Sequence, residues 1–377
     1  MKKVIVVGGG ILGAAAAFEL AKRKASVTII DGEYPGRATA AAAGIICPWV
    51  SQRRNKRWYL LARNGAKYYP ALINELAYYQ ELTTGYTKVG AISLHSDQKK
   101  LEAMLERTLK RKVEAPEIGD ISILSPKQAK ALFPPLADGY GAVHVSGAAR
   151  VDGQALRNSL ISASKKLGAN YLKGNCTLLT DKQKVIGVQT KSETILADEV
   201  IVAGGAWANH LLKPLNISFQ VAEQKGQIVH LELPNTDCRK WPVVMPPHDQ
   251  YILTLESNRI VIGATHENNT NFDYRITVGG IKEIIDKALM FAPGLINSTF
   301  LETKVGFRPF TPDFLPVFGR ITGKDGLLVA NGLGASGLTM GPFIGQQLAK
   351  YILETPDIDF SDYSVNNCII ENNEMTK

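Results

Sequence analysis

Residues 4–13 read Val-Ile-Val-Val-Gly-Gly-Gly-Ile-Leu-Gly, and residues 26–31, after an alanine-rich run, read Ser-Val-Thr-Ile-Ile-Asp. This order predicts a buried strand, a glycine turn, a helix, a second strand and a terminal acid. The same order of elements opens the dinucleotide-binding form of the doubly wound α/β sheet. The stretch therefore predicts an α/β fold that begins at the N-terminus.

The glycines of this stretch fit the pattern G-x-G-x-x-G. Gly8 permits the tight turn, Gly10 lets a pyrophosphate approach the backbone, and Gly13 lets the helix pack closely on the strand. Asp31 ends the second strand, where an acid accepts hydrogen bonds from a ribose. We therefore predict dinucleotide binding, although this motif alone does not separate NAD from FAD.

The composition is that of a globular enzyme with more than one domain. The chain has 377 residues, of which 45% are hydrophobic, and this is enough for a large core. Its net charge is +8, with basic runs at 53–57 and 99–112. Neither run is interleaved with aromatic residues at stacking spacing, so we expect no nucleic-acid partner. Peripheral attraction to an anionic membrane remains an alternative explanation of the charge.

The start of the chain and its cysteines indicate a cytoplasmic protein. Met1-Lys2-Lys3 and the uncharged run behind them resemble a signal peptide, but three glycines interrupt that run and Glu19 ends it. The four cysteines have neither C-x-x-C pairing nor metal-ligand spacing. We expect reduced thiols, no metal site and no transmembrane segment.

Further along the chain, the hydrophobic pattern predicts several helices and then short strands. The composition changes after these strands. We expect helices at 58–79 with a kink at Pro70, at 97–112, from Pro126 to before Pro134, and at 151–167, and strands at 170–172, 185–190 and 199–203. Residues 219–265 contain strand-like runs at 226–231, 251–255 and 259–264, and a helix follows at 281–290. These runs favour an antiparallel sheet in a second domain.

The C-terminal part again shows a strand, a glycine-rich turn and a helix, as the N-terminal stretch does. A buried strand at 327–330 leads through a glycine-rich loop into a helix expected at 342–353. The nucleotide-binding domain is therefore predicted to be discontinuous. We assign residues 1–80, 145–215 and 315–377 to it, and residues 81–144 and 216–314 to the substrate domain.

Four segments carry a resemblance to a known family. They are Arg37-Ala38-Thr39-Ala40-Ala41-Ala42-Ala43-Gly44, Ala203-Gly204-Gly205-Ala206-Trp207, Gly306-Phe307-Arg308-Pro309-Phe310-Thr311-Pro312-Asp313, and the loop at 332–341. Their order resembles the D-amino acid oxidase (DAO) superfamily of FAD enzymes, which includes glycine oxidase, sarcosine oxidase and D-amino acid dehydrogenase. The resemblance spans nearly the whole chain. It implies a Rossmann-like FAD-binding domain and an α+β substrate domain whose antiparallel sheet covers the flavin.

The resemblance also implies which residues contact FAD. They are Gly8, Gly10, Ile11, Leu12 and Gly13 at the pyrophosphate, Asp31 at the ribose, Arg37, Ala38, Thr39 and Gly44 beside the pyrophosphate and flavin, Thr177, Ala203, Gly204 and Trp207 near the adenine half, and Arg308, Gly334, Ser336, Gly337, Leu338 and Thr339 on the flavin side. Gly306 aligns where monomeric sarcosine oxidases carry the cysteine that binds FAD. We therefore expect non-covalent FAD.

The local chemistry agrees with these assignments. The Thr39 hydroxyl can donate to a phosphate, and small neighbours permit close approach. The glycines around Ser336 let backbone N–H groups face a ring, and the helix expected from Pro342 would direct its positive end there. Such an environment stabilises a reduced, anionic flavin.

On the substrate side, Arg308 aligns with the arginine that holds the substrate carboxylate in amine-oxidising relatives. A planar, permanently charged, bidentate donor suits that role. Tyr251 aligns with a tyrosine over the substrate, and an ordinary strand tyrosine is the alternative. His248 is expected to be a loop residue. Glycine oxidase carries a second arginine where this chain has Ala335, so one substrate contact is missing or moved.

The predicted activity is FAD-dependent oxidation of a D-amino acid or a glycine-like amino acid. Hydride passes from Cα to flavin N5, the imino acid hydrolyses to a 2-oxo acid, and oxygen or another acceptor reoxidises the flavin. A 2-hydroxy acid or a secondary amine such as sarcosine is the alternative substrate. An NAD(P)-dependent dehydrogenase and a non-catalytic FAD- or RNA-associated protein are more remote alternatives. The sequence does not define the oligomeric state.

Overall fold

A six-stranded sheet forms the first layer of the computed structural model, which describes residues 1–256 and 258–370. The strand order is β21-β22-β13-β1-β2-β9. The bounds are β1 Lys3–Val7, β2 Ser26–Asp31, β9 Asn170–Lys173, β13 Glu199–Val202, β21 Val317–Arg320 and β22 Leu327–Asn331. All neighbours pair in parallel except β21, which is antiparallel to β22. The N-terminal strand β1 is therefore central and meets strands from distant parts of the chain.

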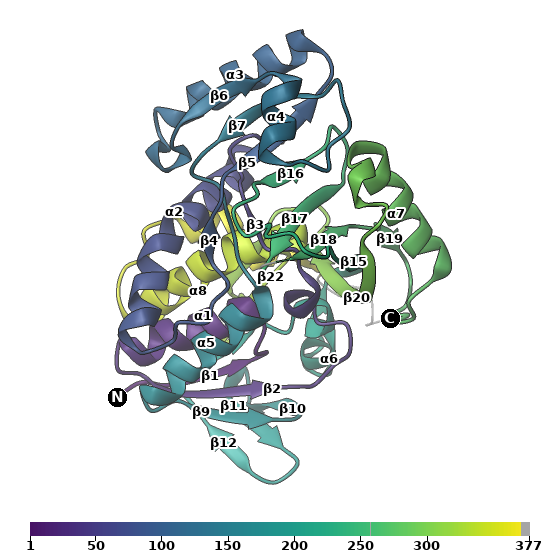
Figure 1. Cartoon of the computed structure of the whole chain (residues 1–377). Helices are drawn as coiled ribbons and strands as arrows, with labels where there is room; N and C mark the ends of the chain where they lie inside the picture. The colour runs from purple at the N-terminus through teal and green to yellow at the C-terminus, as the bar shows by residue number, and fades with distance from the viewer. Residues whose placement is uncertain (257, 371–377) are drawn as a thin grey trace.

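Helices cover one face of this sheet (Figure 1). They are α1 Ile11–Lys22, α2 Lys56–Tyr78, α5 Gly153–Lys166 and α8 Gly337–Leu353. Helix α1 is alanine-rich and buried along nearly its whole length. A Cβ added at Gly345 of α8 would lie 2.6 Å from the backbone nitrogen of Ala16. Glycine and alanine therefore allow α1 and α8 to approach closely under the sheet.

The opposite face is covered by a small sheet and a short helix. The small sheet contains β10 Cys176–Asp181, β11 Lys184–Thr190 and β12 Thr194–Leu196, and the helix is α6 Ala208–Leu212. Side chains of β1 alternate between the two faces: Val4 and Val6 join the core under α1, whereas Ile5 and Val7 join the core under α6. This alternation is why a continuous apolar strand stands at the centre of the sheet.

A nine-stranded, mostly antiparallel sheet forms the second part of the molecule. Its order is β19-β15-β18-β17-β16-β5-β7-β6, with β20 paired to β15. The bounds are β5 Ala91–His95, β6 Ile121–Leu124, β7 Gly141–Val145, β15 Ala222–Glu232, β16 Val243–Met245, β17 Tyr251–Leu255, β18 Arg259–Gly263, β19 Glu267–Asn268 and β20 Thr299–Phe310. Helices α3 Gln98–Lys112, α4 Pro126–Leu132 and α7 Val278–Phe291 flank it. Figure 1 shows α3 and α4 over the β6–β7 end and α7 near the β15–β19 end.

Short strands complete the structure. They are β3 Ile45–Ile46, β4 Thr87–Lys88 and β8 Ala149–Arg150 in one small sheet, and β14 Ser218–Phe219 with β23 Ile369–Ile370 in another. The predicted mixed α/β class is confirmed. The six-stranded sheet draws on the segments assigned to the nucleotide-binding domain, and the nine-stranded sheet on those assigned to the substrate domain. On this distribution we propose to keep the predicted domain division.

One predicted helix boundary is wrong. Helix α8 begins at Gly337, so Pro342 lies inside the helix and not at its start. Proline has no N–H, so it leaves the carbonyl of Leu338 without its usual helical donor. The buried hydroxyl of Tyr69 on α2 donates to that carbonyl at 2.6 Å. The hydroxyl of Tyr69, a residue distant in the chain, thus replaces the missing helical donor and permits proline inside the helix. Helix α8 therefore begins earlier in the chain than the sequence indicated.

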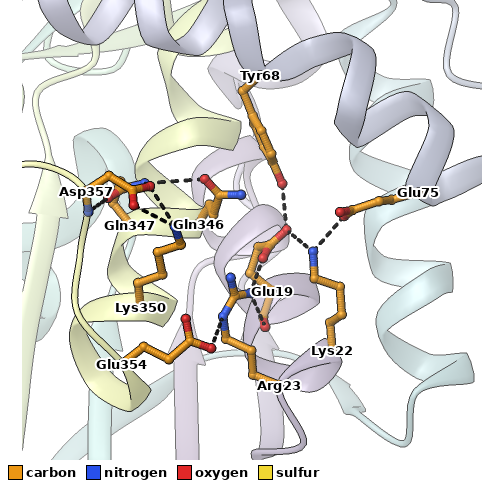
Figure 2. Close-up of polar contacts among 10 residues, drawn as sticks. All are labelled: Glu19, Lys22, Arg23, Tyr68, Glu75, Gln346, Gln347, Lys350, Glu354 and Asp357. Carbon is orange, nitrogen blue, oxygen red and sulfur yellow. Dashed lines mark hydrogen bonds and ion pairs between the residues drawn. The ribbon is translucent and has the colours of Figure 1, made fainter.

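An ionic network around the buried Glu19 joins α1, α2 and the end of α8 (Figure 2). The Glu19 side chain on α1 is only 1% exposed and pairs with Lys22 and Arg23 of the same helix. The hydroxyl of Tyr68 on α2 donates to Glu19 Oε1 at 2.6 Å. Lys22 also contacts Glu75 of α2, and Arg23 contacts Glu354 at the end of α8. Burial and the Glu19 charge raise the pKa of Tyr68, so this phenol stays a neutral donor.

Replacing Tyr68 with phenylalanine is expected to lower the free energy of unfolding by about 1.5–3 kcal/mol. The reason is that hydrogen bonds to buried charged groups contribute this much, and Glu19 would lose one donor. Urea unfolding of the two proteins measures the change. Tyr78→Phe is the matched control, because Tyr78 is 79% exposed and should leave the midpoint unchanged. Equal midpoints for Tyr68→Phe and the wild type would contradict the prediction.

Candidate active site

The glycine turn between β1 and α1 requires glycine at two positions for steric reasons. Gly8 has φ +110°, and a Cβ there would lie 2.4 Å from the carbonyl oxygen of Ala203. A Cβ at Gly13 would lie 1.9 Å from the carbonyl oxygen of Gly8. The turn is therefore packed against the end of β13 and against its own helix. The backbone N–H of Ile11 donates to Thr39 Oγ1 at 3.0 Å, which joins the turn to the loop after β2.

A cavity of about 1060 Å³ opens beside this turn, at the carboxyl ends of the central strands. Ligands of doubly wound sheets bind at this edge. Most of the residues expected at a cofactor line it, namely Gly8, Gly10, Ile11, Leu12, Asp31, Arg37, Ala38, Thr39, Ala203, Gly204 and Trp207. Gly13 is outside the lining and allows the helix to pack on the turn.

Asp31 is the buried acid of this cavity. Its Oδ1 accepts from the backbone N–H of Gly9 at 3.0 Å. Its Oδ2 accepts from Arg157 at 2.6 Å, and from Arg37 and Tyr171 at 3.1 Å each. Arg157 also donates from Nε to the Gly9 carbonyl at 2.7 Å. Sequence reasoning missed Arg157, because it lies within an amphipathic helix whose local pattern does not distinguish it.

Aromatic rings line one end of the cavity. Tyr34 stacks on Trp207 with centroids 5.1 Å apart, and Trp207 stacks on Phe272 at 5.4 Å. Cys176 of β10 lines the same cavity, whereas Thr177 is exposed and outside the lining. Successive side chains of a strand point to opposite faces, which separates these two neighbours. The structure thus does not bring Thr177 to the site.

A second cavity of about 860 Å³ adjoins the first and shares Ala38 with it. Its lining contains Ala41, Ala42, Ala43, Gly44, Ile45, Gly226, Asp249, Tyr251, His266, Gly306, Arg308, Gly334, Ala335, Gly337, Leu338 and Thr339. These residues come from the segment after β2 up to β3, from strands β15, β17 and β20 of the nine-stranded sheet and the loops beside them, and from the first turn of α8 with the turn before it. Of the residues expected on the flavin side, Ser336 alone is outside this lining.

Arg308 is the cation of the second cavity. It lies on β20 opposite Gln224 of β15, and its Nη1 donates to Gln224 Oε1 and to the Thr265 carbonyl at 3.1 Å each. Gly226 leaves room for the guanidinium, since a Cβ there would lie 2.5 Å from Nη2. Burial lowers the pKa of Arg308, but a guanidinium stays charged in proteins. Among the described residues no carboxylate forms an ion pair with it.

Tyr251 and two residues missed from the sequence share this cavity with Arg308. Burial raises the pKa of Tyr251 to about 12, so its hydroxyl is neutral at pH 7. Asp249 and His266 also line the wall, with His266 Nδ1 3.3 Å from Asp249 Oδ2. They precede β17 and follow β18, so their proximity depends on strand pairing. His248, as expected, is an exposed loop residue outside the lining.

The first cavity fits a dinucleotide on these observations. It has a glycine turn that a single Cβ would obstruct, a hydroxyl at Thr39 and a buried acid. The family model described as DAO, FAD dependent oxidoreductase, matches residues 3–351. The chain belongs to this family. The DAO-family match confirms the FAD cofactor and the oxidoreductase class, and it separates the chain from NAD(P)-dependent dehydrogenases.

Relatives cover nearly the whole of this DAO-family chain. It is 57% identical to "Uncharacterized oxidoreductase YurR" of Bacillus subtilis over 96% of the chain and 98% of the relative. The crystal structure of iminodiacetate oxidase from Chelativorans sp. BNC1 superposes with a TM-score of 0.93 at 42% identity, covering 96% and 98% of the two chains. Glycine oxidase from Geobacillus kaustophilus gives a TM-score of 0.84 at 27% identity, covering 97% and 99%.

Two further observations concern membrane and metal sites. Within residues 1–256 and 258–370, no helix combines the length and apolarity that a membrane crossing requires. The same residues contain no group of three or more histidine, cysteine or acidic side chains placed to hold a metal ion.

Proposed function

We propose that this chain oxidises the carbon–nitrogen bond of a small amino acid, with Arg308 binding the substrate carboxylate. The proposal rests on the guanidinium of Arg308. This group faces the second cavity, beside the dinucleotide cavity, and its hydrogen-bond partners are neutral. A largely desolvated cation whose hydrogen-bond partners are neutral is a strong site for a carboxylate. The glycine and iminodiacetate oxidases similar to this chain have names consistent with such a substrate.

In this proposal the first cavity holds FAD without a covalent bond. The turn at residues 8–13 and Thr39 would bind the pyrophosphate, Asp31 the ribose, and the rings of Tyr34 and Trp207 the adenine end. Gly306, near the flavin side, offers no thiol for attachment. Residues Gly334, Gly337, Leu338 and Thr339 would face the flavin, and the N-terminal end of the seventeen-residue helix α8 adds a positive potential there.

The chemical step rests on positioning. Bound FAD supplies the hydride acceptor. Arg308 fixes the carboxylate and thereby the direction of the Cα–H bond, and the neutral hydroxyl of Tyr251 can donate to the same carboxylate. Holding the reacting groups in one orientation supplies much of the rate enhancement. The imino acid then leaves and hydrolyses in water to a 2-oxo acid, and oxygen or another acceptor takes the electrons.

A secondary amine is the second candidate substrate class. The similarity to iminodiacetate oxidase at 42% identity favours it, because iminodiacetate carries its carboxylates on a secondary amine. The same Arg308 geometry would serve a secondary amine equally well. The two classes differ only in what the amine nitrogen carries.

Anaerobic bleaching of the flavin tests the proposal. The purified protein is expected to be yellow and to lose its flavin absorbance with at least one compound from a panel of glycine, D-amino acids, sarcosine, iminodiacetate and proline. Acetate, which has a carboxylate and no amine, is the control and should leave the flavin oxidised. Bleaching by 2-hydroxyglutarate alone would contradict the amine assignment. A colourless protein that takes up no FAD would contradict the whole proposal.

A further inference from the structure

A histidine and an aspartate face the same cavity as Arg308. His266 directly follows Thr265, whose carbonyl accepts from Arg308, and both His266 and Asp249 belong to the cavity wall. The side chains of His266 and Asp249 are 38% and 49% exposed, so the pair also reaches solvent. The His266–Asp249 pair thus lies between Arg308 and the surrounding solvent.

Gln250 and Lys287 hold Oδ1 of Asp249, the carboxylate oxygen that does not face His266. The amide of the buried Gln250 donates to Asp249 Oδ1 at 3.4 Å and to the Ala264 carbonyl at 3.0 Å. Lys287 of α7 lies 3.6 Å from the same oxygen. Asp249 Oδ2 faces His266 Nδ1 at 3.3 Å. A carboxylate at Nδ1 favours the tautomer that carries its proton there, which leaves Nε2 as an acceptor.

The proposed reaction needs such an acceptor. An amino acid in water at pH 7 carries an ammonium group, and the Cα–H bond can leave as hydride only when the nitrogen lone pair is free. One proton must therefore move from the substrate nitrogen before the step. A side chain that takes this proton has to be neutral and has to lie beside the bound carboxylate.

The surroundings keep His266 neutral at pH 7. Burial lowers its pKa below the ordinary value, and the charges of Arg308 on β20 and Lys287 on α7 lower it further. Asp249 and Glu283 of α7 act in the opposite direction. Tyr251 stays neutral and adds no charge. The imidazole is therefore a lone-pair acceptor at neutral pH and becomes a cation only in acid.

We propose that His266, oriented by Asp249, accepts the ammonium proton of the bound amino acid and passes it to solvent. The proton moves from the substrate nitrogen to Nε2, the nitrogen keeps its electron pair, and the imidazolium then loses the proton to water. Asp249 acts through His266 and is a positioning residue. This inference rests on the proposed function, because it needs an amine held by Arg308.

The dependence of kcat/KM on pH tests the inference. The wild type is expected to lose activity on the acid side as His266 becomes protonated. His266→Gln should lower kcat/KM at pH 7 by roughly 10²- to 10⁴-fold. It should also move the acid limb to higher pH, towards the titration of the free substrate ammonium, because only the free amine then reacts. Asp249→Asn should move the acid limb to lower pH, since Asp249 raises the pKa of His266. His248→Gln is the control, because that exposed residue is outside the cavity and should keep the wild-type profile.

Binding of acetate separates this inference from the proposed function. Acetate has no amine and should perturb the flavin spectrum by binding at Arg308 and Tyr251, so its dissociation constant should be the same in His266→Gln and in the wild type. An acid limb that keeps its wild-type position in His266→Gln would overturn the inference, as would an unchanged kcat/KM. A wild type that binds acetate but oxidises no amine at any pH would overturn the proposed function, and this inference with it.

Discussion

Replacing Arg308 with alanine is expected to lower kcat/KM for the best amine substrate by about 30- to 5000-fold. Truncating one partner of a buried charged pair costs about 2–5 kcal/mol, and each 1.36 kcal/mol is tenfold in rate. The effect is large because the described partners of Arg308 are neutral, so the substrate carboxylate would be left without a counter-charge. Stopped-flow reduction of the flavin at increasing substrate concentration measures it.

Two variants control this experiment. Arg308→Lys keeps the charge but loses the planar pair of donors, so it should fall between the alanine variant and the wild type. Arg275→Ala removes a guanidinium that is 84% exposed and paired with Asp273, and it should behave as the wild type. The FAD content of all three should be the same, because the glycine turn, Thr39 and Asp31, which would hold the pyrophosphate and the ribose, line the first cavity and make no hydrogen bond to Arg308. An undiminished kcat/KM in Arg308→Ala would refute the carboxylate assignment.

Replacing Asp31 with alanine is expected to weaken FAD binding by about 100-fold or more. In the proposed site the variant removes the acceptor for the ribose, and each hydrogen bond to a charged group is worth about 1.5–3 kcal/mol. It also removes the acceptor of the Gly9 N–H, in the turn that would receive the pyrophosphate. Titration of the apoprotein with FAD, followed by flavin fluorescence, gives the dissociation constant.

A second variant separates charge from shape in this prediction. Asp31→Asn keeps the side-chain volume and one acceptor oxygen, so it should bind FAD more tightly than the alanine variant and less tightly than the wild type. Thermal unfolding of each apoprotein reports whether the fold itself has changed. An Asp31→Ala protein with the wild-type dissociation constant would show that the ribose is bound elsewhere.

The sequence was most informative where the structure is determined locally. Gly13 was predicted because a Cβ there would meet the carbonyl oxygen of Gly8 within the same motif. The start of α4 at Pro126 was predicted because proline suits the first helical position, and the structure adds a capping box between Ser125 and Gln128. In both cases the residues that decide the conformation are neighbours in the chain.

The sequence was less informative where a distant partner decides. Strand β20 carries charged residues and a proline and was not predicted, because its strand conformation depends on pairing with β15 along most of its length. Pro342 was placed at the start of a helix, because nothing nearby indicates that Tyr69 donates to Leu338. Arg157, Asp249 and His266 were missed for the same reason, since each acquires its neighbours only through the tertiary fold.

The position of β22 beside β13, with β13 between it and β1, bears on how the protein matures. The wall of the first cavity extends to Ala330, Asn331 and Leu333, so a ribosome must synthesise most of the polypeptide before that wall is complete. The N-terminal glycine turn emerges early but lacks the strand that closes the sheet around it. We therefore expect flavin capture late in biosynthesis, and yellow colour in a preparation would report chains in which β22 has already joined the six-stranded sheet.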